Sequence, residues 1–449
     1  MESLNLEYIL ARLRSALERD DIAGATAILE ALRPADQADL FSELDDHEQV
    51  VLLPELAIAD SANILEKMEE REAADLVALL LPEVVVPIVE KMEPDEAADL
   101  LGDLAPEQAE AVLAGLDDPE EVRPLLLHSD DSAGGLMTSE VLALRRKMTA
   151  GEALQAIRLW QPEAEEIYYL FVVDREGVLD GVVSLRQLVV ARPDDRLETI
   201  MDQEVISVLA GTDKEECARL MSRYDLLALP VVGDTGKLLG MVTVDDMVDV
   251  LVDEATEDIQ RLGGAQPLDR PYLDMGTLSI FRKRVGWLLL LFVTESLTGS
   301  VLRHFEAELH AVVALAFFVP LLIGTGGNAG TQTTSTLIRS LAVGEVAPRD
   351  ALHALWHELR VGLLLGLAMS IIAYARALSW GSGHELALTV SLAILAIVVW
   401  ANGLGALLPI LATRFKIDPA VVSGPVMSTL VDATGLFIYF TIARLVLGL

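Results

Sequence analysis

The stretch Pro425-Val-Met-Ser-Thr-Leu-Val-Asp432-Ala-Thr-Gly-Leu-Phe-Ile-Tyr-Phe-Thr-Ile-Ala443 is apolar over a length that can cross a lipid bilayer. Asp432 lies well inside this stretch. A charge at membrane depth costs several kcal/mol, so such a residue usually belongs to an ion pathway or has a partner. Two interpretations follow. Asp432 is a cation site on a permeation path, or its carboxylate is neutralised by a proton or by a neighbouring helix.

Charge divides the 449-residue chain into two unlike parts. Residues 279–449 contain 9 acidic and 11 basic residues, whereas the residues before 279 contain 61 of the 70 acidic and 22 of the 33 basic residues. The first part is therefore strongly acidic, and the second is nearly neutral. Such acidity argues against nucleic acid as a partner, because phosphates would be repelled, and it favours cations. The length predicts about three domains.

The acidic part has the features of a cytoplasmic segment. Cys217 is the single cysteine, so an intramolecular disulfide is impossible, which fits a reducing compartment. The opening residues, MESLNLEYILARLRSALERDD, are charged throughout and lack the apolar core of a signal peptide. We therefore expect this part of the chain to lie in the cytoplasm.

Residues 32–116 repeat with a period of 12 residues. Apolar residues recur at this step, at Leu32, Leu44, Leu56, Met68, Leu80, Met92, Leu104 and Leu116. Further apolar pairs follow eight and nine positions later, and in four units proline stands two positions after the first apolar residue. Because proline suits the first turn of a helix, each unit predicts one short helix and a tight turn. Stacked units would form a small α-superhelix, which distinguishes them from a generic bundle.

A second duplication covers residues 137–250. Phe171-Val-Val-Asp-Arg-Glu-Gly-Val-Leu-Asp-Gly181-Val-Val-Ser184 returns 59 residues later as Pro230-Val-Val-Gly-Asp-Thr-Gly-Lys-Leu-Leu-Gly240-Met-Val-Thr243. Each copy predicts a strand, a turn, a strand and a helix capped by Ser or Thr, and a helical stretch precedes each copy, at 150–160 and 214–224. This order resembles a pair of CBS domains, which are regulatory modules that often bind adenine nucleotides. The resemblance implies sensing rather than catalysis.

One amphipathic helix is expected to join this pair to the apolar part. Residues 248–262, VDVLVDEATEDIQRL, are acidic with regularly spaced apolar residues, and Gly263-Gly264 is a helix-stop signal. Residues 263–276 predict a loop, after which Arg282-Lys-Arg284 would meet the membrane surface. This helix would be the covalent link between sensor and membrane part.

Five membrane spans are expected, at residues 285–303, 310–338, 358–376, 386–412 and 420–446. Eight basic residues fall on one side of these spans and three on the other. Because basic loops tend to stay inside, this bias places the N-terminus in the cytoplasm. With five spans, the C-terminus would then lie outside.

The second span contains the unusual segment Pro320-Leu-Leu-Ile-Gly324-Thr-Gly-Gly-Asn-Ala-Gly330, followed by Thr331-Gln-Thr-Thr-Ser335. We expect the helix to be interrupted there, with protein or water covering the irregular backbone. Close helix packing through small residues is the alternative. The segment lacks the Gly-Lys-Ser/Thr of a phosphate loop, and Ala329 breaks the spacing of a dinucleotide-binding motif.

Together these features resemble the MgtE family of magnesium channels. The resemblance is carried by the domain order, by residues 317–330 and 428–435, and by Ala133-Gly-Gly-Leu-Met-Thr138 at the entrance to the CBS pair. It implies a multidomain homodimer in the plasma (inner) membrane, with a pore between the subunits and a cytoplasmic Mg²⁺ sensor. The expected domains are a helical repeat domain at 1–130, CBS domains at 131–200 and 201–250, a connecting helix and linker at 251–278, and a transmembrane pore domain at 279–449.

Magnesium chemistry agrees with the resemblance at Asp432, which matches the pore aspartate of the family. Mg²⁺ dehydrates reluctantly and is usually held by one or two carboxylates with retained waters. Two copies of Asp432 across a two-fold axis would supply these carboxylates and still release the ion. The candidates for binding the hydration shell along the pore are Ser428, Thr429, Thr434 and Asn328.

The resemblance also implies regulatory Mg²⁺ ligands outside the membrane. Facing carboxylates repel one another, and an interposed Mg²⁺ turns this repulsion into bridging. The implied ligands are Asp95, Asp99, Glu215, Asp225, Asp246, Asp249, Glu254, Glu257, Asp258 and Asp418. From sequence alone, each of them is also readily explained as a solvated surface acid. The mechanism implied is feedback closure of the pore at high cytoplasmic Mg²⁺.

Three positions set this chain apart from the family pattern. Gly424 and Thr331 stand where asparagine is expected, which removes side-chain oxygens near the pore. Glu295 adds a carboxylate inside the first span. We expect these positions to affect ion selectivity more than the fold.

Several other functions compete with Mg²⁺ influx. A channel for Co²⁺ or Mn²⁺ is the nearest alternative, although no cluster of soft ligands accompanies Asp432. A membrane-anchored CBS sensor that does not transport would need neither Asp432 nor the glycine-rich span. A CBS-bearing anion channel conflicts with a carboxylate in the pore. An enzyme is the least expected class, because the sequence shows no nucleophile–base set and its 7 histidines are scattered.

Overall fold

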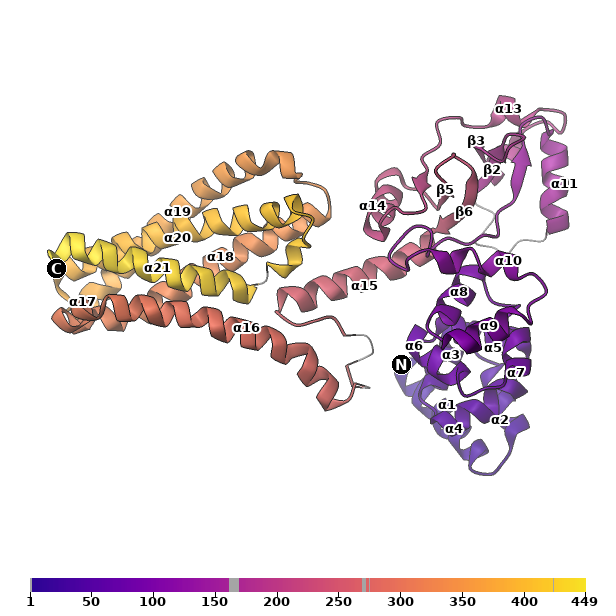
Figure 1. The fold of residues 1–449 in the computed structure, drawn as a ribbon, viewed down its shortest axis with the longest axis horizontal. Coiled ribbons are helices and arrows are strands. Elements are labelled where there is room, and N and C mark those ends of the chain that lie inside the picture. Colours follow the sequence, from indigo (N-terminus) through magenta and orange to yellow (C-terminus); the bar gives the residue numbers. More distant parts are fainter. Residues whose placement is uncertain (1, 161–168, 269–271, 274, 423) are drawn as a thin grey trace. The chain divides into compact units, whose positions relative to one another are not determined.

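In the computed structural model, residues 2–160, 169–268, 272–273, 275–422 and 424–449 are described. The chain forms two compact units, residues 1–251 and 252–449. The first unit contains short helices followed by two small sheets, and the second contains the long apolar helices (Figure 1). The predicted fold class, an α-superhelix, a CBS pair, a connecting helix and five apolar spans, is confirmed.

Short helices follow one another through the first half of the first unit. They are α1 (Glu2–Leu17), α2 (Ile22–Leu29), α3 (Pro34–Ser42), α4 (Asp46–Leu52), η1 (Leu53–Glu55), α5 (Ile58–Lys67), α6 (Glu70–Val77), α7 (Pro82–Val89), α8 (Pro94–Gly102), α9 (Pro106–Leu113), α10 (Pro119–Val122) and η2 (Leu125–Leu127).

Helices α3 to α9 follow the 12-residue repeat, with one helix in each unit. In α3, α7, α8 and α9 the first turn begins with proline, whose missing N–H costs no hydrogen bond there. The apolar pairs eight and nine positions into each unit are buried from Leu40 and Phe41 through to Val112 and Leu113. Each helix therefore buries the same stripe against its neighbours, which is what stacks the units.

Two small sheets complete the first unit. The first copy consists of β1 (Ala143–Arg145), α11 (Ala150–Trp160), β2 (Tyr169–Val173), β3 (Leu179–Ser184), α12 (Leu185–Val190) and α13 (Leu197–Ile200). The second copy consists of β4 (Val208–Leu209), α14 (Lys214–Tyr224), β5 (Ala228–Val232), β6 (Leu238–Thr243) and α15 (Val244–Leu262).

The two sheets have the same topology and equivalent registers. The first strand is parallel to the second, and the second is antiparallel to the third, with Phe171 opposite Val182 and Pro230 opposite Met241. The turn between the antiparallel strands contains a glycine with positive φ in both copies, Gly177 at 84° and Gly236 at 77°. Only glycine adopts such a φ without steric cost, so both hairpins depend on it. These features confirm the duplicated strand–turn–strand prediction.

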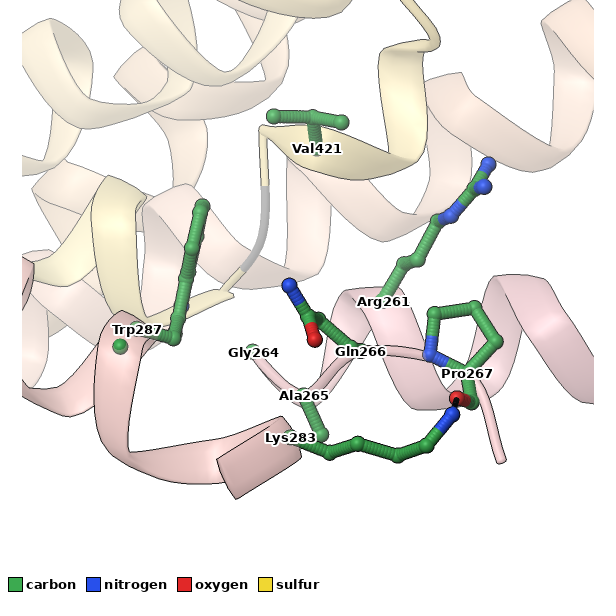
Figure 2. A pocket seen from close by; sticks show the side chains of 9 residues that line it. Arg261, Gly264, Ala265, Gln266, Pro267, Lys283, Trp287 and Val421 are labelled. Carbon is green, nitrogen blue, oxygen red and sulfur yellow. Dashed lines mark hydrogen bonds between the residues drawn. The ribbon is translucent and has the colours of Figure 1, made fainter. Parts of the chain in front are cut away.

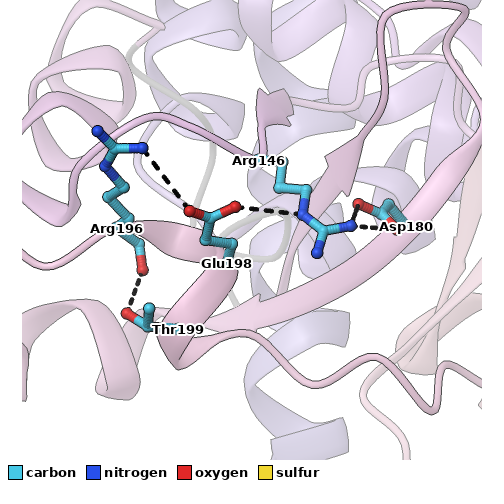
Figure 3. A network of polar contacts seen from close by, with 5 residues as sticks. All are labelled: Arg146, Asp180, Arg196, Glu198 and Thr199. Atoms are coloured by element: carbon cyan, nitrogen blue, oxygen red, sulfur yellow. Dashed lines mark hydrogen bonds and ion pairs between the residues drawn. The ribbon is translucent and has the colours of Figure 1, made fainter.

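A network of polar side chains on the surface of the first copy connects β3 with α13 (Figure 3). The Arg146 guanidinium lies 2.9 Å from Asp180 on β3 and 3.4 Å from Glu198 on α13. Glu198 also lies 3.7 Å from Arg196, and the Thr199 hydroxyl donates to the Arg196 carbonyl at 2.7 Å. Because Arg146 is held between two carboxylates, it ties β3 to α13.

The second unit contains the five helices that are long and apolar enough to span a membrane. Its elements are α16 (Thr277–His304), α17 (Glu306–Ala311), η3 (Val313–Phe318), α18 (Val319–Ala342), η4 (Pro348–Asp350), α19 (Ala351–Ser379), α20 (Gly383–Arg414), η5 (Pro419–Val421) and α21 (Gly424–Leu447). Five spans were predicted from the sequence, and the described residues contain five candidate spans. Helix α20 packs against α18, α19 and α21, and α16 lies along α21 (Figure 1).

The predicted interruption of the second span is wrong. Helix α18 runs without a break from Val319 to Ala342 and includes the whole glycine-rich segment. The glycines serve helix packing, which was the alternative. A Cβ on Gly326 would lie 2.5 Å from Ile397 on α20, and one on Gly330 would lie 2.7 Å from Met427 on α21. Small residues therefore let α20 and α21 approach the α18 backbone.

An ion pair joins α17 to the C-terminal end of α21. Arg444 is hydrogen-bonded to the buried carboxylate of Glu308 on α17, and its guanidinium lies 4.8 Å from the centre of the Phe305 ring. Phe305 stacks in turn on Phe440 of α21, with ring centres 5.1 Å apart. The short helix α17 is thus fastened to the last turns of α21.

The close approach at Gly326 predicts a measurable loss of stability. We expect Gly326→Ala to lower the free energy of unfolding by about 1–3 kcal/mol, because the new methyl group meets two stiff β-branched side chains. Equilibrium unfolding of the purified protein in mixed detergent micelles measures this change. Gly324→Ala is the matched control, since a Cβ there has nothing within 4 Å. Equal stability of the two variants would contradict the packing role.

Candidate functional site

Asp432 lies on α21, inside the last of the candidate membrane spans. It follows the start of the helix at Gly424 by eight residues, which is about 12 Å along the axis. Its side chain is half-buried. Among the described residues, the other charge that acts on it is the carboxylate of Glu295 on α16. The described part of the chain thus provides no basic partner for Asp432.

Polar groups precede Asp432 by one turn. Ser428 shares its helix face, because residues four apart lie one above the other. A Cβ on Gly327 would lie 3.2 Å from the Ser428 hydroxyl oxygen, so α18 touches α21 at this level. The predicted pore-lining residue Asn328 is the next residue on α18 and is exposed. Thr429 is buried, and its hydroxyl donates to the Pro425 carbonyl at 3.0 Å.

Thr434 lies apart from this group. It is about 200° around α21 from Asp432, because each residue advances the helix by about 100°. Its hydroxyl donates to the Leu430 carbonyl at 2.7 Å and accepts from the indole N–H of Trp400 on α20 at 2.9 Å. The structure therefore does not bring Thr434 together with Asp432 in one subunit.

Gly424 and Thr331, the two positions at which asparagine was expected, lie against each other. A Cβ on Gly424 would lie 3.1 Å from the Thr331 side chain, which is tighter than an ordinary van der Waals contact. Any larger residue at 424 would require Thr331 to move. Gly424 and Thr331 are therefore a packing pair, which sequence reasoning did not identify.

Sequence reasoning also missed a polar network inside the spans. Asn402 on α20 is 1% exposed, and its side-chain oxygen accepts from the Thr333 hydroxyl of α18 at 2.7 Å. The same hydroxyl lies 3.3 Å from the Glu358 carboxylate of α19. Three helices thus meet at one hydrogen-bonded point. The sequence did offer a signal for this network, because Glu358 and Asn402 stand within otherwise apolar helices.

Three predicted regulatory residues come together in the first unit. Asp95 on α8 is 6% exposed, and one of its carboxylate oxygens has no hydrogen-bond partner among the described residues. Burial, and next the Asp246 carboxylate of α15, hold the pKa of Asp95 well above its usual range. Burial and neighbouring carboxylates raise the pKa of Asp99 to about 7. Burial is also the main cause that raises the pKa of Asp246.

Two further groups belong to this acidic cluster and were not predicted. Burial raises the pKa of Glu96 to about 8, with Asp246 and Glu66 adding to the shift. Lys67, at the end of α5, lies within reach of the charges of Glu96 and Asp249. Burial pulls the pKa of Lys67 down, but the surrounding carboxylates leave it above its ordinary value. An ammonium group thus stands among the acidic side chains.

Glu215 and Asp225 are not brought to one point. Glu215 lies in the first turn of α14, and Asp225 caps the other end of that helix in a left-handed conformation. The two are about 15 Å apart along the axis, because ten residues separate them. One ion cannot bind both within a subunit.

The predicted ligands around the connecting helix do come together in the second unit. Burial, and next the Asp418 carboxylate, raise the pKa of Asp258, with Glu254 contributing in the same direction. Arg261 bridges this group, because its guanidinium is paired with both Glu257 and Asp418. The other oxygen of Asp418 accepts from the Ala420 N–H at 2.8 Å. Carboxylates of α15 and of the loop before α21 thus share one arginine.

These clusters fit a hydrated, hard cation better than a dehydrated one. Among the residues that the structure describes, no three His, Cys, Asp or Glu side chains converge closely enough to coordinate a metal directly. The donors are carboxylates held near one another at an electrostatic cost. Mg²⁺ is usually bound by one or two carboxylates through retained water, so this donor set suits it.

Among the described residues, five helices are long and apolar enough to span a membrane, the last of them carries a half-buried carboxylate, and acidic clusters lie outside them. These are the features of an integral membrane protein that handles cations. Similarity to known protein families identifies the class of membrane protein directly. The divalent cation transporter domain of MgtE matches residues 319–442, the MgtE intracellular N domain matches 32–131, and CBS domains match 133–194 and 197–253. The chain belongs to the MgtE family.

Relatives of known name support this assignment. The magnesium transporter MgtE of Thermus thermophilus is 47% identical over 339 residues, which is 75% of each chain. The Bacillus subtilis magnesium transporter MgtE is 34% identical over 73% of this chain and 72% of its own. The crystal structure of a cytosolic domain of the Mg²⁺ channel MgtE in complex with ATP is 40% identical, with a TM-score of 0.51, over 54% of this chain and 99% of its own.

Raising the pH should destabilise the acidic cluster when no divalent cation is present. The pKa values of Asp95, Glu96 and Asp99 lie above those of unfolded chains. The folded state then binds more protons than the unfolded state between roughly pH 4 and 8, so stability falls as pH rises through this range. In EDTA we expect the unfolding temperature to fall with pH, and to fall less steeply for Glu96→Gln.

Glu107→Gln on α9 is the matched control for this measurement, because Glu107 is exposed. Differential scanning fluorimetry of wild type and both variants, with and without Mg²⁺, measures the slopes. Mg²⁺ should recover most of the loss in wild type at high pH. The same slope for wild type and Glu96→Gln would contradict the close approach of these carboxylates.

Proposed function

We propose that this protein is a Mg²⁺ channel or transporter of the plasma (inner) membrane that mediates Mg²⁺ influx. The observation that carries the proposal is Asp432, a carboxylate inside a candidate span for which the described residues supply no basic partner. Leaving a charge there without a counter-ion is costly, and a passing cation is the partner that would offset the cost. The names of the relatives in Thermus thermophilus and Bacillus subtilis favour magnesium as that cation.

The proposed pore lies between two subunits. In a homodimer, two copies of Asp432 would face one ion across the two-fold axis, with Ser428 and Asn328 nearby to bind its water. Such a site attracts Mg²⁺ without stripping its hydration shell, so the ion can leave again. The carboxylate of Glu295 would add to the negative potential at this level.

The proposed gate responds to cytoplasmic Mg²⁺. At low Mg²⁺ the carboxylates of Asp95, Asp99 and Asp246 repel one another, which favours separation of the elements that carry them. At high Mg²⁺ the cation bridges them and compacts the cytoplasmic domains. The same event at Asp258 and Asp418 would set α15 against the loop that precedes α21, and thereby close the pore.

The remaining assignments follow from the same proposal. The N-terminus would lie in the cytoplasm and the C-terminus outside, as the bias of basic residues predicts. The predicted domain boundaries, at 130, 200, 250 and 278, stay predictions. An adenine nucleotide at the CBS pair is supported by the ATP-bound cytosolic domain that this chain resembles.

Removal of the Asp432 carboxylate should abolish Mg²⁺ uptake. In proteoliposomes we expect Asp432→Ala to reduce the initial rate by about tenfold or more, because the ion loses its charged partner. The variant should still elute as a folded dimer in size-exclusion chromatography. Glu385→Gln, an exposed carboxylate in the first turn of α20, is the matched control and should transport normally.

The same assay separates the alternatives. Uptake measured with Mg²⁺, Co²⁺ and Mn²⁺ in turn should be fastest with Mg²⁺, because no soft ligand accompanies Asp432. Faster Co²⁺ or Mn²⁺ uptake would favour the alternative cation channel. Absence of all uptake by the wild-type protein would favour a sensor that does not transport.

Mg²⁺ should protect the cytoplasmic part from proteolysis. We expect millimolar Mg²⁺ to lengthen the half-time of trypsin cleavage in the first unit by at least about fivefold, because binding to the compact state reduces opening. Asp246→Asn should lose most of this protection, while the exposed control Glu83→Gln should keep it. Identical cleavage with and without Mg²⁺ in wild type would refute the gating proposal.

A further inference from the structure

A pocket of about 580 Å³ lies where the end of α15 meets the start of α16 (Figure 2). Its lining comes from the end of α15, the loop that follows, the first turns of α16 and the 3-10 turn before α21. The side chains that matter here are Arg261, Gln266, Lys283 and Trp287. The pocket is distinct from Asp432 and from the acidic cluster of the first unit.

The polar groups around this pocket are predominantly hydrogen-bond donors. Lys283 brings an ammonium group, Arg261 a guanidinium and Gln266 an amide. The indole N–H of Trp287 is buried and has no hydrogen-bond partner among the described residues. No Asp or Glu is among the described residues that line the pocket. A lining of this kind suits a ligand rich in acceptors and negatively charged.

Gly264 has no side chain, and this lets the Trp287 indole pack directly against the backbone of the loop after α15. Gly264 has a φ of 73°, and a Cβ there would lie 2.5 Å from the Trp287 indole nitrogen. Glycine is thus required both by the backbone conformation and by the close approach of the ring. The indole N–H of Trp287 therefore lies against the Gly264 backbone and has no acceptor among the described residues.

Hydrogen bonds hold the loop in place without a ligand. The N–H of Ala265 donates to the Gln260 carbonyl at 3.0 Å, and the N–H of Leu268 donates to the Gln260 side chain at 2.6 Å. The N–H of Gln266 donates to the Lys283 carbonyl at 3.2 Å, and the Lys283 ammonium donates to the Pro267 carbonyl at 2.5 Å. The donors are therefore pre-positioned, which lowers the entropic cost of binding.

The pocket's place in the second unit restricts the ligand. Lys283 and Trp287 lie in the first three turns of α16, the first candidate span, and tryptophan favours the level of lipid head groups. Basic pockets at this level are suited to phosphate head groups. The volume exceeds what a bare phosphate needs and lies within the range of sites for small organic ligands.

We propose that this pocket binds a phosphate oxyanion, carried by a phospholipid head group or by a soluble phosphate compound. The Lys283 ammonium and the Trp287 indole N–H would donate to its oxygens, and the Gln266 amide would complete the set. Arg261 would be shared between the oxyanion and its partners Glu257 and Asp418. Binding is independent of the proposed transport function, because it is measured without ion flux.

The experiment uses the full-length protein in detergent and three probes. They are dihexanoyl phosphatidylglycerol, inorganic phosphate, and dihexanoylglycerol, which lacks the phosphate. Native mass spectrometry measures lipid retention, and thermal unfolding measures the stabilisation by each probe. We expect the phosphate-bearing lipid to bind at least about tenfold more tightly than dihexanoylglycerol, because charge-assisted hydrogen bonds to the phosphate are lost. Stabilisation by inorganic phosphate alone would identify a soluble source, and lack of it a lipid source.

Two variants and a matched control locate the binding. Lys283→Met should weaken binding about tenfold. Trp287→Phe, which removes the N–H donor with its five-membered ring and keeps an aromatic side chain, should weaken it about threefold. Arg284→Met removes the same charge from the same helix, but Arg284 does not line the pocket, so binding should be unchanged. Should Lys283→Met fail to fold, Trp287→Phe against Arg284→Met still decides. Equal binding of the lipids with and without phosphate, or equal losses in the variants and the control, would overturn the proposal.

Discussion

The carboxylate of Asp432 lies half-buried about a third of the way along α21, and among the described residues the other charge acting on it is also negative. A charge at this depth is costly unless a counter-ion or water accompanies it. Glycines on α18 let α20 and α21 come close to that helix, and Ser428 lies one turn below Asp432 on the same face. The transmembrane part can be understood as a frame that holds this carboxylate.

Carboxylates also lie close to one another in the regions outside the candidate spans. Among the described residues, carboxylates gather on α8 and α15, and a basic side chain lies among each group, Lys67 in the first unit and Arg261 in the second. Each basic side chain offsets part of the repulsion. A divalent cation would have to compete with it. In the proposed gating, Lys67 and Arg261 would lower the affinity of the clusters for Mg²⁺, so that bridging would need a high concentration.

Much of the fold was predictable because it is written in periodic patterns. The 12-residue step, the duplicated hairpin and five apolar stretches each fix local structure and burial. The glycine-rich segment misled the prediction, because glycine marks both broken helices and tight helix packing, and only the neighbouring α20 and α21 decide between them. Lys67 and Arg261 were missed for a related reason. A sequence shows which charges exist, but only the fold shows that Thr434 faces Trp400 or that Arg261 reaches Asp418.

The central claim is that Asp432 interacts with Mg²⁺ through a retained hydration shell. Inhibition of Mg²⁺ flux by hexaamminecobalt(III) tests it most directly, because this complex resembles hydrated Mg²⁺ in size and does not exchange its ligands. In proteoliposomes of the wild-type protein, the account predicts inhibition that Mg²⁺ relieves competitively. Undiminished Mg²⁺ flux in an excess of the complex would contradict it.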